Sequence, residues 1–296
     1  MDNYQVQIGT AATGVHLSPA PFERIVAALR CAVDAMAAGE TDEVFAAPPV
    51  IARATVERAG YVRSFPHLLG SVHCFGGDRR DWQQLVKLAD GGDWHRAQQI
   101  TDLVLLPAAC YHVYPLWTDQ VRRLDRPVCV HATCFRQEAT DEPGRLRSFR
   151  MTEIVRAGQP EECLRWRDEW RDRLAAWLTD LGLTAVAEVA DDPFFGPGNR
   201  LLREAQRDQQ LKWELRVPVA DGQPQAVASC NYHLDHFGTA FGITLRGGPA
   251  HTACVAFGLD RLVLALYHRH GPDPTEWPDR IHRALQGARI DSTGAR

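Results

Sequence analysis

The sequence predicts an α+β fold in which helices flank a mixed antiparallel sheet within a single domain. From Leu103 onward, segments typical of strands follow one another and are separated by turn residues. Amphipathic helical patterns lie before and after this strand-rich region. The chain of 296 residues is 45% hydrophobic and 24% charged, which suits one large globular domain over residues 1–296.

The N-terminal part of the chain predicts mainly helices. Ser18, Pro19 and Pro21 are typical of a helix start, and Gly39 of a helix end. We therefore expect an N-terminal helical segment over about residues 18–38. The further expected elements are a strand at Glu43–Pro48, helices at Val50–Ala59 and Asp81–Ala89, and a buried strand end and turn from Leu103 to Pro115.

The segment Thr133–Gly158 predicts two antiparallel strands joined by a long loop rich in Gly, Pro and acids. Arg136 and Glu138 are expected on one face of the first strand, because side chains repeat every second residue. The planar, permanently charged fork of Arg136 suits the charge that develops on an α-phosphate under attack.

The segment His251–Tyr267 predicts a strand at Ala253–Phe257, then Gly258 and an apolar helix. Arg261 lies in the first turn of this helix. An arginine beside a helix N-terminus is a natural seat for a terminal phosphate. Either segment alone is also compatible with a surface hairpin or an ordinary helix start.

The region between these segments predicts a long helix at Glu161–Leu181 and a short helix within Phe194–Gln210. Arginines on the long helix lie among acids, so we expect a solvated face there. These are Arg165, Arg167, Arg171 and Arg173. The expected strands are Thr184–Val189, Leu211–Val219 and Ala226–Tyr232, and the short helix carries Arg200, Arg203 and Arg207.

Composition limits the function classes. The chain has no run of the roughly 18 apolar residues that a membrane span needs, and its first residues lack a secretory pattern, so we expect a cytoplasmic protein without membrane contact. A formal net charge of −4 and a pI of about 6.3 disfavour extensive tRNA contact. The eight cysteines show no CxxC spacing, so most are expected to be buried thiols.

The two segments resemble motifs 2 and 3 of the class II aminoacyl-tRNA synthetases, with FRQE and SFRMTE as motif 2 and AFGLDRLVLAL as motif 3. The resemblance implies that Arg136 grips the α-phosphate of ATP and Arg261 folds back its γ-phosphate. It also implies that Phe149 stacks on adenine and that Glu138 contacts the adenine side. A weak motif 1 at Gly60–Pro66 implies a dimer interface, and hence a homodimer.

Over nearly its whole length the chain resembles the amino acid:[carrier protein] ligases, truncated relatives of the methanogen-type seryl-tRNA synthetases. The stretches that carry this resemblance are GYVRSFPHLLGSVHCFGG, CYHVYP, DPFFG and SCNYHLDHFG. In both families Cys, Glu and Cys bind a zinc ion that holds the amino group of the substrate. The resemblance assigns these ligands to Cys110, Glu153 and Cys254, whereas spacing alone would suggest two buried thiols and a paired carboxylate.

Several other polar residues are candidates without a settled role. Asn231, His233 and His236 either line an amino-acid pocket, where Asn231 joins Glu153 in binding substrate, or are satisfied by core hydrogen bonds. Lys212 reaches either phosphate or solvent. Either Arg145 or Arg147 is expected to meet ATP from the loop of motif 2.

The predicted activity has two steps. A small amino acid, glycine or alanine by the resemblance, is activated with ATP and Mg²⁺ to an aminoacyl-adenylate, and is then passed to the phosphopantetheine thiol of a carrier protein. The alternatives are a minimal seryl-tRNA synthetase, a noncatalytic paralogue and an amide-forming ligase. The absence of a tRNA-binding domain argues against the first, and retained Arg136 and Arg261 against the second. We expect residues 194–210 to dock the carrier through their positive charge.

Overall fold

The computed structural model describes residues 7–286 except 42, 119–123, 125, 141, 221 and 246. Within these residues the largest sheet has seven strands, in the order β3-β7-β8-β14-β11-β10-β9. Neighbouring strands are antiparallel except for β3 and β7, so the predicted mixed antiparallel sheet is confirmed. The strands are β3 (Val44–Ala46), β7 (Val128–Phe135), β8 (Ser148–Gly158), β14 (His251–Gly258), β11 (Gln223–Tyr232), β10 (Lys212–Val219) and β9 (Val186–Val189).

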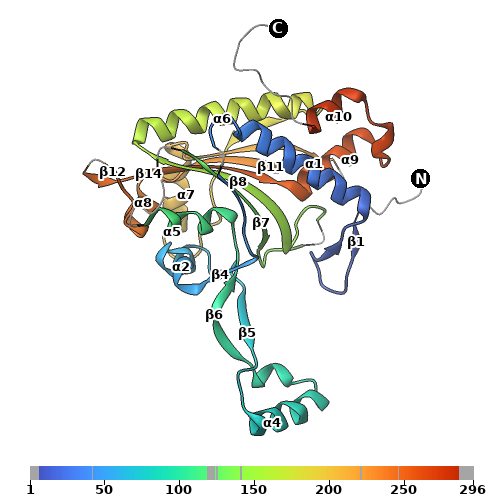
Figure 1. Ribbon diagram of the computed structural model, residues 1–296, viewed down its shortest axis with the longest axis vertical. Coiled ribbons are helices and arrows are strands. Elements are labelled where there is room, and N and C mark those ends of the chain that lie inside the picture. Colours follow the sequence, from blue (N-terminus) through green and yellow to red (C-terminus); the bar gives the residue numbers. More distant parts are fainter. Residues whose placement is uncertain are drawn as a thin grey trace.

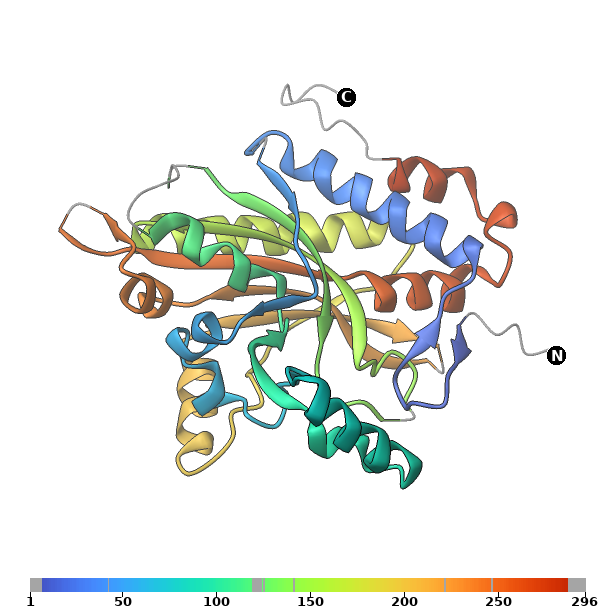
Figure 2. The same ribbon diagram turned by 60° about the horizontal axis from the view of Figure 1, so that its bottom comes forward.

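Helices cover one face of this sheet, as Figures 1 and 2 show. They are α1 (Ala20–Ala37), α6 (Pro160–Asp180), α9 (Leu259–His270) and α10 (Asp279–Leu285). The side chains of β14 that point toward them are apolar, and Phe257 packs edge-on against Trp170 and Trp177 of α6, with ring centroids 6.5 and 6.0 Å apart. This layer is the larger hydrophobic core.

The opposite face of the sheet packs against short helical turns. Val155 of β8 and Cys254 and Ala256 of β14 belong to this second core, together with the 3₁₀ turn η2 (Ala109–His112) and the helices α5 (Tyr114–Trp117) and α8 (His236–Phe241). Because Glu153 and Cys254 alternate with residues of the first core, they too face this side. The candidate site residues therefore lie on the face that the long helices leave uncovered.

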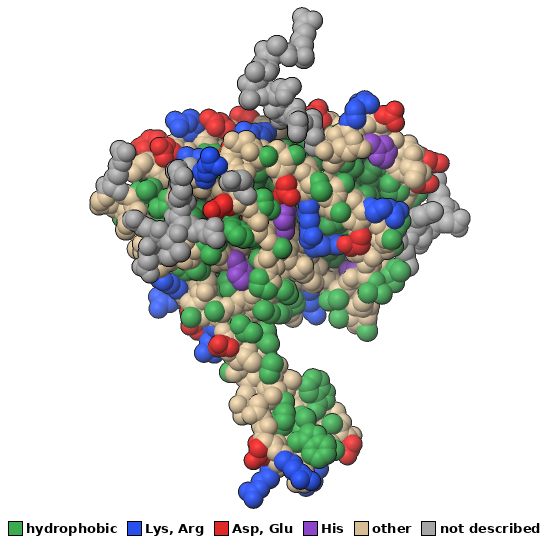
Figure 3. All heavy atoms as spheres, viewed as in Figure 1, with side chains coloured by type: hydrophobic (Ala, Val, Ile, Leu, Met, Phe, Trp, Pro, Cys, Tyr) green, Lys and Arg blue, Asp and Glu red, His purple; other side chains and the backbone are tan. Residues whose placement is uncertain are grey.

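A separate arm projects from the body of the molecule (Figure 1). Its base is a second sheet of β4 (Val50–Ala52), β6 (Gln99–Leu105) and β5 (Ser71–Cys74), and its tip holds α4 (Arg79–Asp90) and η1 (Trp94–Ala97). Asp78 starts α4 with a capping box. The arm exposes apolar side chains, among them Trp82 and Trp94, at its tip (Figure 3).

The remaining described elements connect these parts. They are the hairpins β1 (Ile8–Gly9) with β2 (His16–Leu17) and β12 (Thr244–Leu245) with β13 (Gly248–Pro249), together with α2 (Arg53–Arg58), α3 (Tyr61–Ser64), α7 (Asn199–Asp208) and η4 (Pro274–Glu276). Among the described helices, none has the length and apolar character needed to span a membrane.

Two expectations about these elements are wrong, whereas the expected strand end and turn between Leu103 and Pro115 are confirmed, since β6 ends at Leu105 and helical turns follow. The segment Val50–Ala59 begins as strand β4 before it turns into α2, because its apolar start pairs with β6. Arg167 is buried, with its guanidinium donating to the Gln210 carbonyl at 2.6 Å and paired with Asp168, so it does not belong to a solvated face.

Candidate active site

A cavity of about 690 Å³ opens on the uncovered face of the central sheet. It brings together residues from six separate parts of the chain, which a linear sequence cannot place side by side. The predicted site residues among its lining are Cys110, Arg136, Glu138, Arg145, Phe149, Glu153, Asn231, Cys254 and Arg261. Arg147 is not among them, so of the two loop arginines the structure places Arg145 at the cavity.

Cys110, Glu153 and Cys254 converge in the wall of this cavity. One potential ligand atom from each lies within 4.8 Å of those from the other two, and all three residues are buried. The pairing of the strands explains the arrangement: Glu153 lies opposite Ala256, and Cys254 lies two residues earlier on the same face of β14. Turn η2 brings in Cys110, and the Ala109 amide donates to Glu153 Oε1 at 2.9 Å.

Hydrogen-bond donors surround Cys254 more densely than Cys110. Asn231 Nδ2 lies 3.3 Å and His233 Nε2 3.6 Å from Cys254 Sγ. A hydrogen bond from Cys110, supported by His233 and Asn231, lowers the pKa of Cys254 well below its ordinary value. The same bond and burial raise the pKa of Cys110. Burial, followed by the Cys254 charge, raises the pKa of Glu153 to about 8.

Three arginines, Arg136, Arg145 and Arg261, line the same cavity and act on one another electrostatically. Arg261, in the first turn of α9, donates to the carbonyl oxygens of Gly144 at 2.9 Å and Ala226 at 3.0 Å. Burial, followed by the charges of Arg145 and Arg136, lowers the pKa of Arg261 to about 10. Like charges held this close are stabilised by an anion between them. The part of the cavity beside these arginines is therefore suited to a polyphosphate.

Arg136 and Phe149 are joined by a cation–π contact, with the guanidinium carbon 5.4 Å from the ring centroid. Arg136 Nε also donates to the Pro107 carbonyl at 3.1 Å. Strand β7 ends at Phe135, so the expectation that Arg136 and Glu138 share a strand face is wrong. Both residues still line the cavity, because the Arg136 amide bonds to the Arg147 carbonyl and keeps the chain beside β8.

Sequence reasoning missed a partly buried ion pair in the cavity wall. Lys212 Nζ lies 2.7 Å from Asp192 Oδ1 and 3.2 Å from Glu214 Oε1. Burial opposes the charge of Lys212, but the two carboxylates raise its pKa above the ordinary value. Lys212 thus reaches two carboxylates in the cavity wall, and its contact with phosphate stays a prediction. The DPFFG stretch, whose first residue is Asp192, was the sequence feature that could have indicated this partner of Lys212.

His236 and the segment Gly60–Pro66 are tied to each other. His236 Nε2 bonds to the Ala59 carbonyl at 2.9 Å, so its ring fixes the start of α3. Tyr61 and Phe65 of this segment line the cavity. The part of the chain assigned to motif 1 therefore builds the wall of the site, and its predicted role in a dimer interface stays a prediction.

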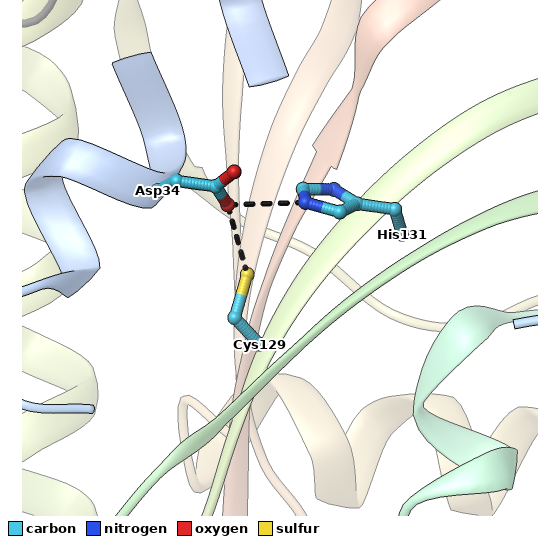
Figure 4. Close-up of side chains that lie close together, drawn as sticks. All are labelled: Asp34, Cys129 and His131. Carbon is cyan, nitrogen blue, oxygen red and sulfur yellow. Dashed lines mark hydrogen bonds and ion pairs between the residues drawn. The ribbon is translucent and has the colours of Figure 1, made fainter. Parts of the chain in front are cut away.

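A second cluster of potential ligands, Asp34, Cys129 and His131, lies on the helix-covered face of the sheet (Figure 4). Asp34 Oδ1 lies 3.0 Å from His131 Nε2 and accepts from Cys129 Sγ at 3.6 Å. The other ring nitrogen of His131 bonds to Thr152 Oγ1 at 2.8 Å. These mutual hydrogen bonds satisfy the three side chains and fasten α1 to β7, so the cluster is structural.

Helix α7 lies over the outer part of the cavity, where Leu202, Ala205 and Gln206 contribute to the lining. Its arginines are paired with acids: Arg203 and Arg207 with Asp191, and Arg200 with Glu204 at 2.7 Å. These acids offset much of the positive charge that the three arginines alone would give to the segment. The helix also exposes large apolar side chains, with Leu201 71% exposed.

The chain is similar to two bacterial proteins from Bradyrhizobium diazoefficiens. It is 42% identical over 277 residues to amino acid--[acyl-carrier-protein] ligase 1, which covers 92% of this chain and 85% of that protein. It is 41% identical over 283 residues to ligase 2, which covers 94% of this chain and 84% of that protein. No protein-family model matches the chain.

More distant similarity extends to the seryl-tRNA synthetases. The type-2 serine--tRNA ligase of Methanopyrus kandleri is 31% identical over 196 residues, which are 60% of this chain and 37% of that protein. The crystal structure of M. kandleri seryl-tRNA synthetase with tRNASec superimposes with a TM-score of 0.78 at 23% identity, over 95% of this chain and 58% of that one. The latter similarity establishes a class II synthetase fold, and this chain spans little more than half of that protein.

Proposed function

Because this chain belongs to the amino acid--[acyl-carrier-protein] ligase family, we propose that it activates a small amino acid with ATP and passes it to the thiol of a carrier protein. One observation carries this proposal. A single cavity is lined both by an arginine cluster and by the Cys110–Glu153–Cys254 cluster, so one bound amino acid can direct its carboxylate to the phosphates and its amine to the three ligands.

In the first step, a carboxylate oxygen of the amino acid attacks the α-phosphorus of ATP, and pyrophosphate leaves with the electrons of the broken P–O bond. Arg136 is our candidate for stabilising charge on the α-phosphate, while Arg145 and Arg261 hold the outer phosphates. Phe149, whose ring contacts the Arg136 guanidinium, is our candidate for stacking on adenine. Glu138 is our candidate for a contact with the adenine edge. Mg²⁺ accompanies ATP as part of the substrate.

The cluster of Cys110, Glu153 and Cys254 fits a zinc ion. Two thiols and one carboxylate form a donor set that zinc accepts, and all three residues line the cavity, which leaves a side open to substrate. A bound zinc would supply a Lewis acid that holds a neutral amine. Asn231 and His233 hold Cys254 in place through their contacts with its sulfur.

The walls beside these ligands favour a small amino acid such as glycine or alanine. Tyr111 follows Cys110 directly, and its ring meets Phe237 edge to face at 5.9 Å between centroids. Both rings line the cavity and are buried. Bulky, packed side chains at this position limit the volume left for a substrate side chain.

In the second step, the sulfur of a phosphopantetheine arm attacks the acyl carbon of the adenylate, a thioester forms, and AMP leaves. The enzyme needs no nucleophile of its own, because the carrier brings the thiol. Helix α7 is our candidate docking element, since it lies at the cavity and exposes Leu201 beside Arg200. An apolar contact with a charged rim is typical of transient docking surfaces.

We also propose that the protein is a homodimer. The exposed tryptophans Trp82 and Trp94 of the arm support an additional protein contact, because large apolar side chains gathered on a surface usually mark one. The mass of the purified protein in solution, measured by light scattering, tests this proposal. A monomer at micromolar concentration would contradict it.

The proposed activity is tested in two assays on one sample. Pyrophosphate exchange into ATP, measured across the amino acids, identifies the substrate, and metal analysis determines zinc per chain. A second assay offers either tRNA or a phosphopantetheinylated carrier to the activated amino acid. We expect exchange with a small amino acid, about one zinc per chain and transfer to the carrier alone. Transfer to tRNA would support the seryl-tRNA synthetase alternative, and no exchange would contradict catalysis.

A further inference from the structure

The hydroxyl of Tyr114 is buried, and among the residues that the structure describes it has no partner at full hydrogen-bond geometry, although it interacts with the Cys110 side chain. The side chain is 0% exposed. Its ring is fixed on both sides, stacked on Phe237 with centroids 3.9 Å apart and packed against Trp117 and Phe241. A buried hydroxyl without a partner costs free energy, so its retention at this position calls for a partner that arrives later.

Tyr114 lies one helical turn after Cys110, at the metal-ligand end of the site. Its ring also meets that of His233, which contacts Cys254. The groups that act on the Tyr114 hydroxyl include Cys110, Cys254 and Glu153, and the interaction with Cys110 is a side-chain hydrogen bond. The hydroxyl is therefore a donor next to the three ligands.

The two sulfurs of the cluster differ in their donors. Cys254 has two side-chain donors, Asn231 and His233, and it also receives the proton of Cys110. A metal ion that binds both sulfurs displaces that proton, because the ligand form of cysteine is the thiolate. Cys110 then changes from a donor into a charged acceptor that needs a donor of its own.

We propose that Tyr114 is this donor: its hydroxyl bonds to the Cys110 thiolate when the cluster binds zinc, and so positions Cys110 and strengthens metal binding. The inference rests on the metal centre proposed above. Tyr114 is not among the residues that line the cavity, so it acts through Cys110 and not on the substrate. Partners of metal ligands typically change metal affinity by about 10- to 100-fold when they are removed.

The substitution Tyr114→Phe tests this assignment, because it removes one oxygen and keeps the ring. Zinc affinity is measured on the full chain by competition with a chelator, and the melting temperature is measured with and without zinc. We expect zinc to bind about 10- to 100-fold more weakly. The melting temperature of the metal-free variant should stay equal or rise, because an unpaired buried hydroxyl has been removed.

Tyr267→Phe is the matched control. Tyr267 is a partly buried tyrosine of α9 that packs on Phe22 and Trp277 in the other core, and its change should leave zinc affinity unaltered. Equal zinc affinity in the wild type and Tyr114→Phe overturns this inference and leaves the metal centre standing. A lower melting temperature without zinc, in parallel with weaker binding, shows a packing role and overturns it as well. A wild-type chain that binds no zinc overturns both proposals.

Discussion

The guanidinium of Arg150 and the carboxylate of Asp260 form a two-point ion pair that joins strand β8 to helix α9. Arg150 Nη2 lies 2.5 Å from Asp260 Oδ1, and Arg150 Nε lies 3.3 Å from Oδ2. The Arg150 amide also donates to Oδ2 at 2.6 Å. Phe149 precedes Arg150 and Arg261 follows Asp260, so this pair sets the spacing between two residues that we propose to hold ATP.

Asp260→Ala is expected to lower the free energy of unfolding by about 3 kcal/mol, because it leaves a largely buried guanidinium without its main partner. Urea denaturation measures this loss. The control is Glu23→Ala, which removes the exposed partner of the same guanidinium and should cost less than about 1 kcal/mol. An equal loss of unfolding free energy in Asp260→Ala and Glu23→Ala would contradict the claim that Asp260 is the stronger partner of Arg150.

Arg261→Lys is expected to weaken ATP binding about 10- to 100-fold, because an ammonium cannot keep the two carbonyl contacts and face a phosphate at once. Pyrophosphate exchange at varied ATP concentration measures the change. Arg269→Lys is the control, since Arg269 lies on the same helix and also donates to a backbone carbonyl, that of Gly182. An unchanged KM for ATP in Arg261→Lys would speak against the phosphate role.

Cys110→Ala is expected to abolish zinc binding and amino-acid activation together, because two ligands do not hold the ion against solvent. Metal analysis and pyrophosphate exchange on the same preparation measure both. Cys163→Ala is the matched control, since Cys163 is equally a buried thiol but lies in the other core. Retained zinc with retained activity in Cys110→Ala would falsify the metal assignment.

Zinc affinity is expected to rise with pH up to about 8. The pKa of Glu153 is raised to about 8 from 4.5, so the folded chain keeps a proton at neutral pH that a metal ion must displace. The same shift makes the metal-free protein less stable as pH rises through this interval, because the unfolded chain releases the proton first. Calorimetric titration in buffers of different protonation enthalpy counts the protons released. Binding without proton release near neutral pH is the contrary result.

The double variant Arg200→Glu with Leu201→Ser is expected to lower transfer to the carrier at least about tenfold and to leave pyrophosphate exchange intact. Arg203 and Arg207 are unsuitable targets, because both hold Asp191 next to the Asp192–Lys212 pair of the cavity. Arg165→Glu serves as the control, since Arg165 forms the same i,i+4 pair with Glu169 on α6. Carrier titrations measure the effect, and a parallel loss of both activities would exclude α7 as the docking element.

Local patterns predicted the elements that have their own start and stop signals. Helices α1, α4 and α6 and the strand–helix junction at Gly258 appear close to the predicted bounds. The pattern misled at Val50–Ala59, where pairing with β6 overrides a helical preference. The local pattern also misled at Arg167. The neighbouring acids suggested a solvent-exposed face, whereas the Arg167 guanidinium donates to the distant Gln210 carbonyl.

The sequence by itself determined the α+β class and the two motif segments, because these depend on residue type and on order along the chain, and its resemblance to a known family supplied the candidate ligands. Only the tertiary structure decided that Lys212 is held by Asp192, that Arg145 and not Arg147 lines the cavity, and that the buried Tyr114 hydroxyl interacts with Cys110. Such contacts arise from strand register and packing between distant segments, and no local pattern encodes the distances that result.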